Sequence, residues 1–300
     1  MKIIESKKAI IFDLFDTLTG YESDWSAIPP VSVMLGVDSK AWNEQLLLHS
    51  NDRLTGALRD PFLIVKNMAH NINHSIPDEI IRQVVIKRMK RYQDALWNIP
   101  PENIETIRQL RQLHKKIALL SNADIMECNG WDHSPLKPLF DVVVFSCYAG
   151  LAKPDPAAYL YCLDKLGVDS FDCLFVGDGG SNELAGAHAL GITTVFVSDK
   201  MKDKQTEALL VRIQQSDYHI DKIPGLLELY FPFRVPRSTF RVLCSAFCVP
   251  RSVFCVLRSA FCVLRSAFRV LRSVFCVPRS VFRVQRSTFR VPRSVFMKPF

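Results

Sequence analysis

The last 67 residues of this 300-residue chain contain no Asp or Glu. The formal net charge of the whole chain is +8, but residues 234–300 hold 13 Arg together with Lys298. Residues 1–233 therefore carry 24 basic side chains against 30 acidic ones and are net acidic. Because the positive charge belongs to one end of the sequence, it does not predict a protein whose main part binds nucleic acid or an anionic membrane.

Long apolar runs, paired cysteines and nucleotide-binding glycine loops are absent as well. No run of about 18 apolar residues occurs, and charges interrupt the apolar N-terminal segment, so we expect neither a membrane span nor a signal peptide. The nine cysteines include no CxxC pair, and no G-x-G-x-x-G or Walker-type pattern is present. With 48% hydrophobic and 23% charged residues, we expect a folded, soluble, cytoplasmic protein with reduced thiols.

A seven-residue repeat fills the C-terminal part of the chain. From Phe233 to Phe296 a phenylalanine recurs at every seventh position, with Val and Ser at the same interval. Such a period is typical of a coiled coil, but proline occupies one apolar position in several copies and excludes a long helix. The variable positions exchange chemically unlike residues that single-base changes can interconvert, so the repeat resembles expanded DNA translated in frame. We therefore predict that residues 231–300 are a low-complexity tail outside the fold.

Two other interpretations of this tail stay open. Regularly spaced Arg and Phe side chains can follow a phosphate backbone and stack on bases, so nucleic acid could bind here, and we expect it nowhere else in the chain. Segments rich in Val and Phe can also form aggregation-prone strands. The sequence gives no indication of an oligomeric state.

Short β-branched runs alternate with helical patterns through the rest of the chain. This alternation predicts an α/β fold with a doubly wound, Rossmann-like parallel sheet. About a hundred residues separate the first two expected strands, far more than an ordinary crossover needs, and their periodicity is helical. We therefore predict a core formed by residues 1–19 and 99–230, with a helical cap inserted at residues 20–98. The expected strands are 9–12, 117–120, 142–145, 173–176 and 193–197, and the expected cap helices are 41–49, 61–71 and 79–96.

Polar side chains follow four successive strands. Ligands of open parallel sheets bind beyond the carboxyl ends of the strands, so we expect these side chains to converge. The basic run at residues 87–91, in contrast, is most typical of a solvated helix face, although a cap residue that meets an anionic substrate could come from it. The converging residues are Asp13 and Thr17 after the first strand, Ser121 and Asn122 after the second, Lys153 before the fourth, and Asp178 and Glu183 after the fourth.

These residue types suit a group transfer to a carboxylate. Asp13, at a strand end, can attack phosphorus or carbon as a nucleophile. Lys153 can keep Asp13 ionised and can face phosphoryl oxygens. Thr17 and Ser121 can donate hydrogen bonds to those oxygens as charge develops, and we assign Asn122 beside them to substrate binding.

The same edge predicts a metal site. A dianionic substrate beside carboxylates needs charge compensation, and Asp13 with Asp178 can hold a Mg²⁺ ion that keeps most of its water. Glu183 would orient the metal-bound water. In the order and spacing of these motifs the chain resembles the haloacid dehalogenase superfamily over about residues 8–200, in the subclass whose helical cap follows the first strand. The resemblance implies that the backbone carbonyl of Phe15 is a further metal ligand.

One position departs from the phosphatases of this superfamily. They have a second Asp two residues after the nucleophile for acid-base catalysis, where this chain has Phe15 followed by Asp16. Dehalogenating members resemble this chain in having an aromatic residue there, but they tend to lose the acid that this chain keeps as Asp178. The resemblance therefore implies a Mg²⁺-dependent hydrolase of a small phosphate ester, acting through an aspartyl-phosphate intermediate. A metal-independent 2-haloacid dehalogenase and a non-catalytic binding module on the same fold are the alternatives.

Overall fold

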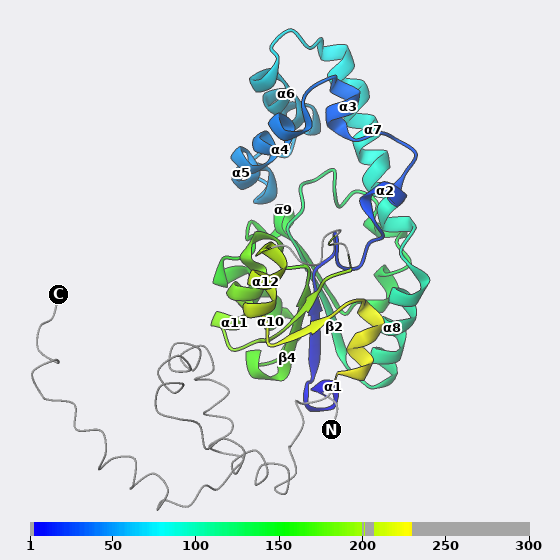
Figure 1. The fold of residues 1–300 in the computed structure, drawn as a ribbon, viewed down its shortest axis with the longest axis vertical. Helices are drawn as coiled ribbons and strands as arrows, with labels where there is room; N and C mark the ends of the chain where they lie inside the picture. Colours follow the sequence, from blue (N-terminus) through cyan, green and yellow to red (C-terminus); the bar gives the residue numbers. More distant parts are fainter. Residues whose placement is uncertain (1–2, 200, 202–206, 230–300) are drawn as a thin grey trace, which may run out of the picture. The chain divides into compact units, whose positions relative to one another are not determined.

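The computed structural model describes residues 3–199, 201 and 207–229. The C-terminal repeat, with the predictions that concern it, lies outside these residues. Among the described residues, six parallel strands form one sheet in the order β3-β2-β1-β4-β5-β6, with β1 near the middle (Figure 1). This confirms the predicted α/β class and the parallel sheet. The strands are β1 Ala9–Phe12, β2 Lys116–Ser121, β3 Val142–Phe145, β4 Cys173–Gly177, β5 Thr193–Val197 and β6 Tyr218–Ile220.

Helices cover both faces of the sheet, as the nearly continuous apolar strands require. One face packs against α8 and the segment after β6, through Ile107, Leu110 and Leu226. The other face packs against α10, α11 and α12, through residues such as Tyr159 and Leu184. In Figure 1 these groups lie to the right and left of the strands. The helices are α1 Ile3–Ser6, α8 Pro101–Gln112, α9 Ser146–Ala149, α10 Pro156–Leu166, α11 Glu183–Ala189 and α12 Glu207–Gln214.

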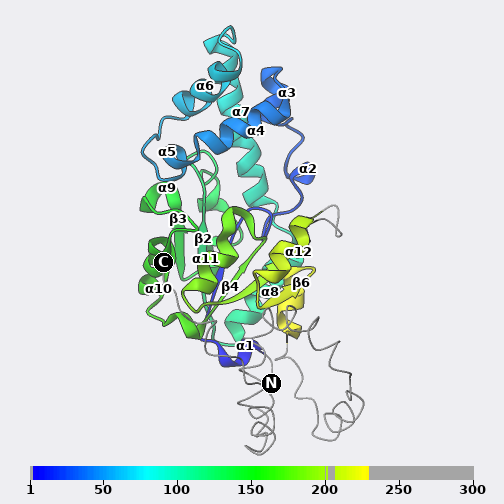
Figure 2. The same ribbon diagram turned by 60° about the vertical axis from the view of Figure 1, so that its left-hand side comes forward.

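Six helices lie between β1 and α8, and we call them the helical insertion. Its own apolar core joins α3, α4, α6 and α7 through side chains such as Trp42, Val65 and Ile81. Aspartates begin two of the helices: Asp38 Oδ1 accepts from the Ala41 N–H at 2.9 Å, and Asp60 caps α6 in the same way. Figure 2 shows these helices grouped beyond the carboxyl ends of the strands. They are α2 Glu22–Trp25, α3 Val31–Leu35, α4 Ser39–Leu48, α5 Ser50–Leu54, α6 Pro61–Ile72 and α7 Asp78–Trp97.

The strand order places the predicted site residues at one sheet edge. β1 pairs with β2 on one side and with β4 on the other, and all three run in the same direction. Asp13 continues the pairing beyond β1, since its N–H donates to the Val176 carbonyl at 2.9 Å. The carboxyl ends of these three strands therefore lie next to one another beneath the helical insertion. No helix within residues 3–199, 201 and 207–229 combines the length and apolarity that crossing a membrane requires.

Candidate active site

A buried ammonium group lies at the centre of the polar side chains that follow the strands. Lys153, between α9 and α10, is only 4% exposed. Its Nζ lies 2.5 Å from Asp13 Oδ1 and 2.5 Å from Glu183 Oε2. Burial alone would lower the pKa of Lys153, but the two carboxylates outweigh this effect and raise that pKa above its ordinary value. Lys153 is therefore a fixed positive charge between the segment after β1 and the start of α11.

The loop after β2 holds the backbone of this lysine. The Nδ2 of Asn122 donates to the Lys153 carbonyl oxygen at 2.7 Å, and the Lys153 N–H donates to Asn122 Oδ1 at 2.8 Å. On the other side, the Tyr159 hydroxyl donates to the Glu183 carbonyl at 2.8 Å. The sequence assigns Asn122 to substrate binding. In the structure its amide forms a two-bond clamp that places the ammonium group.

Three carboxylates crowd around this lysine. Asp13, Asp178 and Glu183 each offer one oxygen, and these oxygens lie within 4.8 Å of one another. Burial first, and then the charge of Asp13, raise the pKa of Asp178 and raise that of Glu183 to about 8. Backbone amides partly offset the charge: the Gly180 N–H donates to Asp178 Oδ1 at 3.1 Å, and the Gly179 N–H donates to Glu183 Oε1 at 3.0 Å. A cation among these oxygens would relieve the remaining repulsion.

The donor set fits Mg²⁺, because hard carboxylate oxygens are the ligands that this ion prefers and one or two carboxylates are enough to hold it. Both oxygens of Glu183 already accept hydrogen bonds, from Lys153 and from the Gly179 N–H. This arrangement suits a carboxylate that orients its surroundings. Asp178 also accepts at both oxygens, from the Gly180 N–H and from Arg212, so a cation held by Asp13 and Asp178 would share the Asp178 carboxylate with these donors.

Two buried hydroxyl groups at the same edge have no hydrogen-bond partner among the described residues. They are Thr17 Oγ1 and Ser121 Oγ, and both residues are 1% exposed. A buried polar group without a partner costs about 1–3 kcal/mol, so these hydroxyls favour a ligand that supplies acceptors. The oxygens of a phosphoryl or carboxylate group are such acceptors.

The position two residues after Asp13 carries an aromatic side chain and not an acid. The ring of Phe15 packs against Trp25 and Tyr92 of the helical insertion, with ring centroids 5.7 Å and 5.3 Å away. Asp16 is exposed and has a left-handed backbone with φ 58°. The aromatic group therefore joins the sheet edge to the insertion, in the position where an acid-base carboxylate was expected of a phosphatase.

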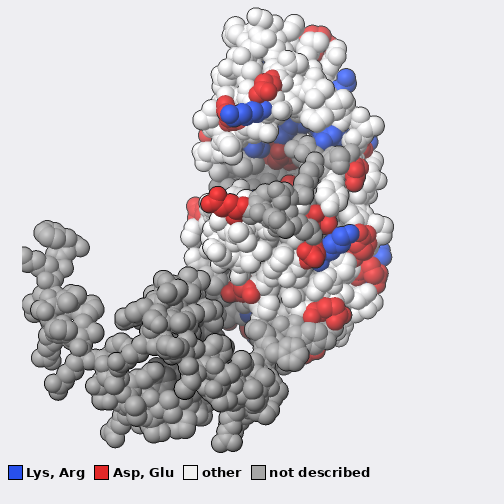
Figure 3. Space-filling model, in the orientation of Figure 1, with Lys and Arg blue, Asp and Glu red and all other residues white. Residues whose placement is uncertain are grey.

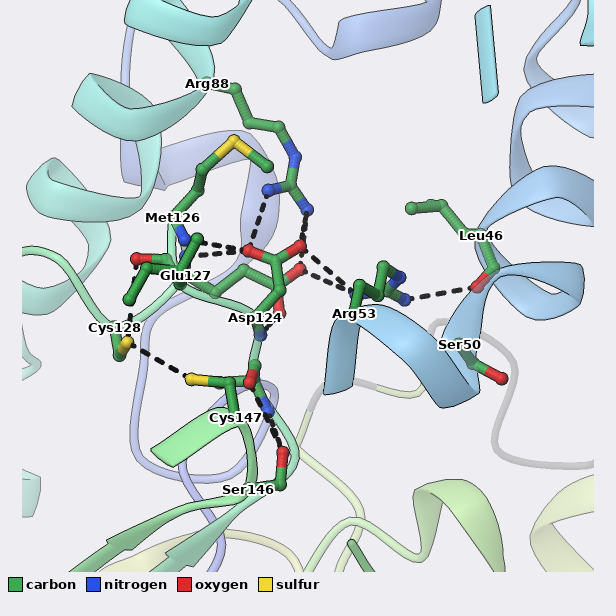
Figure 4. Close-up of polar contacts among 12 residues, drawn as sticks. Leu46, Ser50, Arg53, Arg88, Asp124, Met126, Glu127, Cys128, Ser146 and Cys147 are labelled. Atoms are coloured by element: carbon green, nitrogen blue, oxygen red, sulfur yellow. Dashed lines mark hydrogen bonds and ion pairs between the residues drawn. The ribbon is translucent and has the colours of Figure 1, made fainter. Parts of the chain in front are cut away.

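A second buried charge cluster joins the helical insertion to the loop after β2 (Figure 4). Arg88 of α7 donates to Asp124 Oδ1 at 3.1 Å and to Glu127 Oε1 at 2.7 Å. Arg53 of α5 contacts the same two carboxylates at 3.4 Å. Both arginines outweigh the burial of Asp124 and lower the pKa of its carboxyl. Met126, between the two acids, packs into the apolar core of the insertion, so this loop fixes the insertion above the site.

The basic run at residues 87–91 is not a uniformly solvated face, and that prediction is wrong for two of its members. Arg88 and Arg91 are 1% and 6% exposed, whereas Lys87 and Lys90 are exposed. The two arginines lie three residues apart and share the buried face of α7 with Val84. The helical periodicity of that apolar face was the signal that could have identified them. In the space-filling view, acidic and basic side chains lie in the recess between the insertion and the sheet (Figure 3).

The comparisons with known proteins agree with this architecture. A family model described as haloacid dehalogenase-like hydrolase matches residues 7–191, which is more than half of the chain. The chain therefore belongs to the haloacid dehalogenase-like hydrolases, as the order of its motifs predicts.

Individual relatives match only in part. Acyl-CoA dehydrogenase family member 10 of Mus musculus is 38% identical over 112 residues, which cover 37% of this chain and 10% of that protein. Glyceraldehyde 3-phosphate phosphatase of Methanocaldococcus jannaschii is 27% identical over 139 residues, which cover 45% of this chain and 58% of that protein. The chain thus spans less than two thirds of either relative. A crystal structure of a dehalogenase shares the fold, with a TM-score of 0.56 and 21% identity over 76% of this chain and 99% of that one.

The buried cluster yields a prediction about stability. Arg88→Met leaves Asp124 and Glu127 with the longer ion pairs of Arg53 and with backbone N–H donors. We expect the free energy of unfolding to fall by about 3–5 kcal/mol because the buried acids lose the arginine nearest to them. Urea denaturation followed by circular dichroism measures this change. As a control, Lys137→Met removes an exposed pair with Asp132 and should cost less than about 1 kcal/mol. Equal losses in the two variants would contradict the proposed importance of the cluster.

The crowded carboxylates yield a prediction about pH. The ordinary pKa of Glu183 is 4.5 and the folded chain raises it to about 8, so the folded state binds this proton more tightly than the unfolded state does. The resulting stabilisation is present below about pH 4.5 and is lost as the pH rises through 8. In chelator-treated protein, urea denaturation should therefore show a free energy of unfolding that decreases across this range. The decrease should be smaller in Asp13→Asn, which lacks one source of the repulsion; the same decrease in both proteins would count against this origin.

Proposed function

We propose that the chain is a Mg²⁺-dependent phosphatase that hydrolyses a small phosphate ester through an aspartyl-phosphate on Asp13. The observation that carries this proposal is the set of three carboxylate oxygens from Asp13, Asp178 and Glu183 within 4.8 Å of one another. A hydrolase that used no metal would have no need for this concentration of negative charge beside its nucleophile. The phosphatase named among the relatives supports the same choice.

In this proposal each buried group has a defined part. A carboxylate oxygen of Asp13 attacks phosphorus, the ester oxygen leaves, and water then hydrolyses the acyl phosphate to release inorganic phosphate and restore Asp13. Lys153 keeps Asp13 ionised and balances the charge of the phosphoryl group. The hydroxyls of Thr17 and Ser121 donate to the phosphoryl oxygens and so gain the partners that they lack in the described residues.

Asp13 and Asp178 would hold the metal, together with the Phe15 carbonyl, as the family resemblance implies. Mg²⁺ would neutralise the phosphoryl charge and so let two anions approach each other. Glu183, whose oxygens accept from Lys153 and Gly179, keeps these neighbours in place and would orient metal-bound water. Asn122 acts through the Lys153 backbone.

The proposal divides the chain into a hydrolase core at residues 1–19 and 99–230 and a cap at residues 20–98, with the tail at residues 231–300 outside the catalytic unit. The cap would select the substrate, because its helices lie above the carboxyl ends of the strands. The aromatic group of Phe15, Trp25 and Tyr92 would form part of the wall that the leaving group meets.

Phe15 favours one alternative, a metal-independent 2-haloacid dehalogenase. A halide leaves without protonation, so such an enzyme needs no acid at this position. The two functions differ in their dependence on metal. A dehalogenase would release halide from a 2-haloacid in the presence of a chelator, and the phosphatase would cleave phosphate esters only with Mg²⁺.

The first activity prediction concerns the nucleophile. The full chain should hydrolyse an aryl phosphate with Mg²⁺ and lose this activity on chelation, and Asp13→Asn should reduce kcat by at least about 10³-fold because the amide cannot attack phosphorus. Release of phosphate or of the aryl alcohol measures both effects. Asp132→Asn, an exposed aspartate paired with Lys137, is the matched control and should keep full activity. Phosphatase activity that survives in Asp13→Asn would show that another residue is the nucleophile.

The second activity prediction concerns the missing acid. Because Phe15 cannot protonate the leaving oxygen, kcat/KM should fall steeply as the pKa of the leaving alcohol rises, and good aryl leaving groups should exceed alkyl ones by about 10²-fold or more. A series of substituted aryl and alkyl phosphates measures this slope. Asp16→Asn should leave the slope unchanged, because Asp16 is exposed. A loss confined to poor leaving groups in that variant would instead assign the acid role to Asp16.

A further inference from the structure

A basic residue from outside the family match contacts the acidic centre. Arg212 lies on α12, beyond residues 7–191 to which the family model corresponds. Its Nη1 donates to the Asp178 carbonyl oxygen at 2.8 Å and to Asp178 Oδ2 at 3.2 Å. One guanidinium nitrogen thus holds both the backbone and the side chain of the same aspartate.

The packing of the loop after β4 is adapted to this contact. Gly179 has a left-handed backbone with φ +82°, and a Cβ there would lie 3.0 Å from both Cγ and Cδ of Arg212. The methylene groups of the arginine therefore occupy the space that a side chain at Gly179 would need. Arg212 and Asp178 have side-chain exposures of 27% and 21%, so the pair is partly shielded from solvent. The contact is consequently a packed one and not a chance meeting of two surface chains.

Two basic side chains form ion pairs with the three acids of this centre. Lys153 is bonded to Asp13 and Glu183, and Arg212 is bonded to Asp178. Among the described residues that compose this centre, three carboxylates face two cations. Asp178 is the acid with a positive partner of its own, and both of its oxygens accept hydrogen bonds, from the Gly180 N–H and from Arg212. A divalent cation that binds Asp178 must therefore share this carboxylate with a positive charge already in contact with it.

We propose that Arg212 is a positioning residue that holds Asp178 in place without metal and weakens the binding of a divalent cation at this centre. The inference rests on the proposed function, which places Mg²⁺ at Asp13 and Asp178. Arg212 orders the carboxylate through its contacts to Oδ2 and to the carbonyl, and its charge opposes the incoming ion. The centre is thereby kept ordered in the free protein and binds Mg²⁺ less tightly than its three carboxylates alone would.

Isothermal titration of the chelator-treated full chain with Mg²⁺ tests this inference directly, without a substrate. Arg212→Gln should bind Mg²⁺ about tenfold more tightly than the wild type, because the variant removes a positive charge that contacts a carboxylate of the metal site and so repels a divalent ion. Arg212→Lys keeps the charge and should stay within about threefold of the wild type. Arg108→Gln on α8, which removes an exposed arginine near Glu105, is the matched control and should not change the affinity. Circular dichroism and the Tm of each variant establish that it is folded.

The outcomes separate this inference from the proposed function. Unchanged or weaker Mg²⁺ binding in folded Arg212→Gln overturns the role of Arg212, as does Arg212→Lys that binds as tightly as Arg212→Gln. If Asp178→Asn abolishes Mg²⁺ binding in that same experiment, the metal site of the proposed function survives. Absence of Mg²⁺ binding in the wild type and in every variant overturns the metal site and the role of Arg212 together.

Discussion

The buried ion pairs of Lys153 are the constraint on which the candidate site depends. An ammonium group that is 4% exposed is stable only with charged partners, and Asp13 and Glu183 supply them at 2.5 Å. The dependence is mutual, because the crowded carboxylates repel one another without the lysine. Three segments of the chain must therefore meet at this point. The strand order places β1 beside β4, which brings Asp13 and Glu183 together, and Asn122 after β2 holds the Lys153 backbone next to them.

The loop after β2 transmits this constraint to the helical insertion. Asn122 clamps the Lys153 backbone, and two residues further on Asp124 begins the buried cluster with Arg88 and Arg53. Met126 continues into the apolar core of the insertion. One short segment thus contacts Lys153, the arginines of α5 and α7, and the apolar side chains of the helices. The position of the insertion and the geometry of the site are therefore coupled through the same few residues.

The site combines two features that imply different demands on a substrate. Asp13, Asp178 and Glu183 bring three carboxylate oxygens within 4.8 Å of one another, which suits a site where a cation shields an anionic ligand. Phe15, two residues after Asp13, offers no group for acid-base chemistry, and its ring packs against Trp25 and Tyr92. In the proposed phosphatase, this combination would favour substrates whose leaving group departs without help from an acid. Arg212 adds a further charge to this balance from a helix that the family match does not include.

The sequence by itself determined the parallel sheet and the order of its polar loops. Short β-branched runs bounded by helical patterns have few other ways to bury their apolar surface, and strands β1, β3 and β5 have the predicted bounds. The three-residue strand β6 was missed because so short an edge segment carries little periodicity. Only the tertiary structure decided the burial of Arg88, the clamp of Asn122 and the contact of Arg212 with Asp178. These contacts join polar and charged side chains that lie far apart in the sequence. A local sequence pattern does not show which of these side chains will meet in the folded chain.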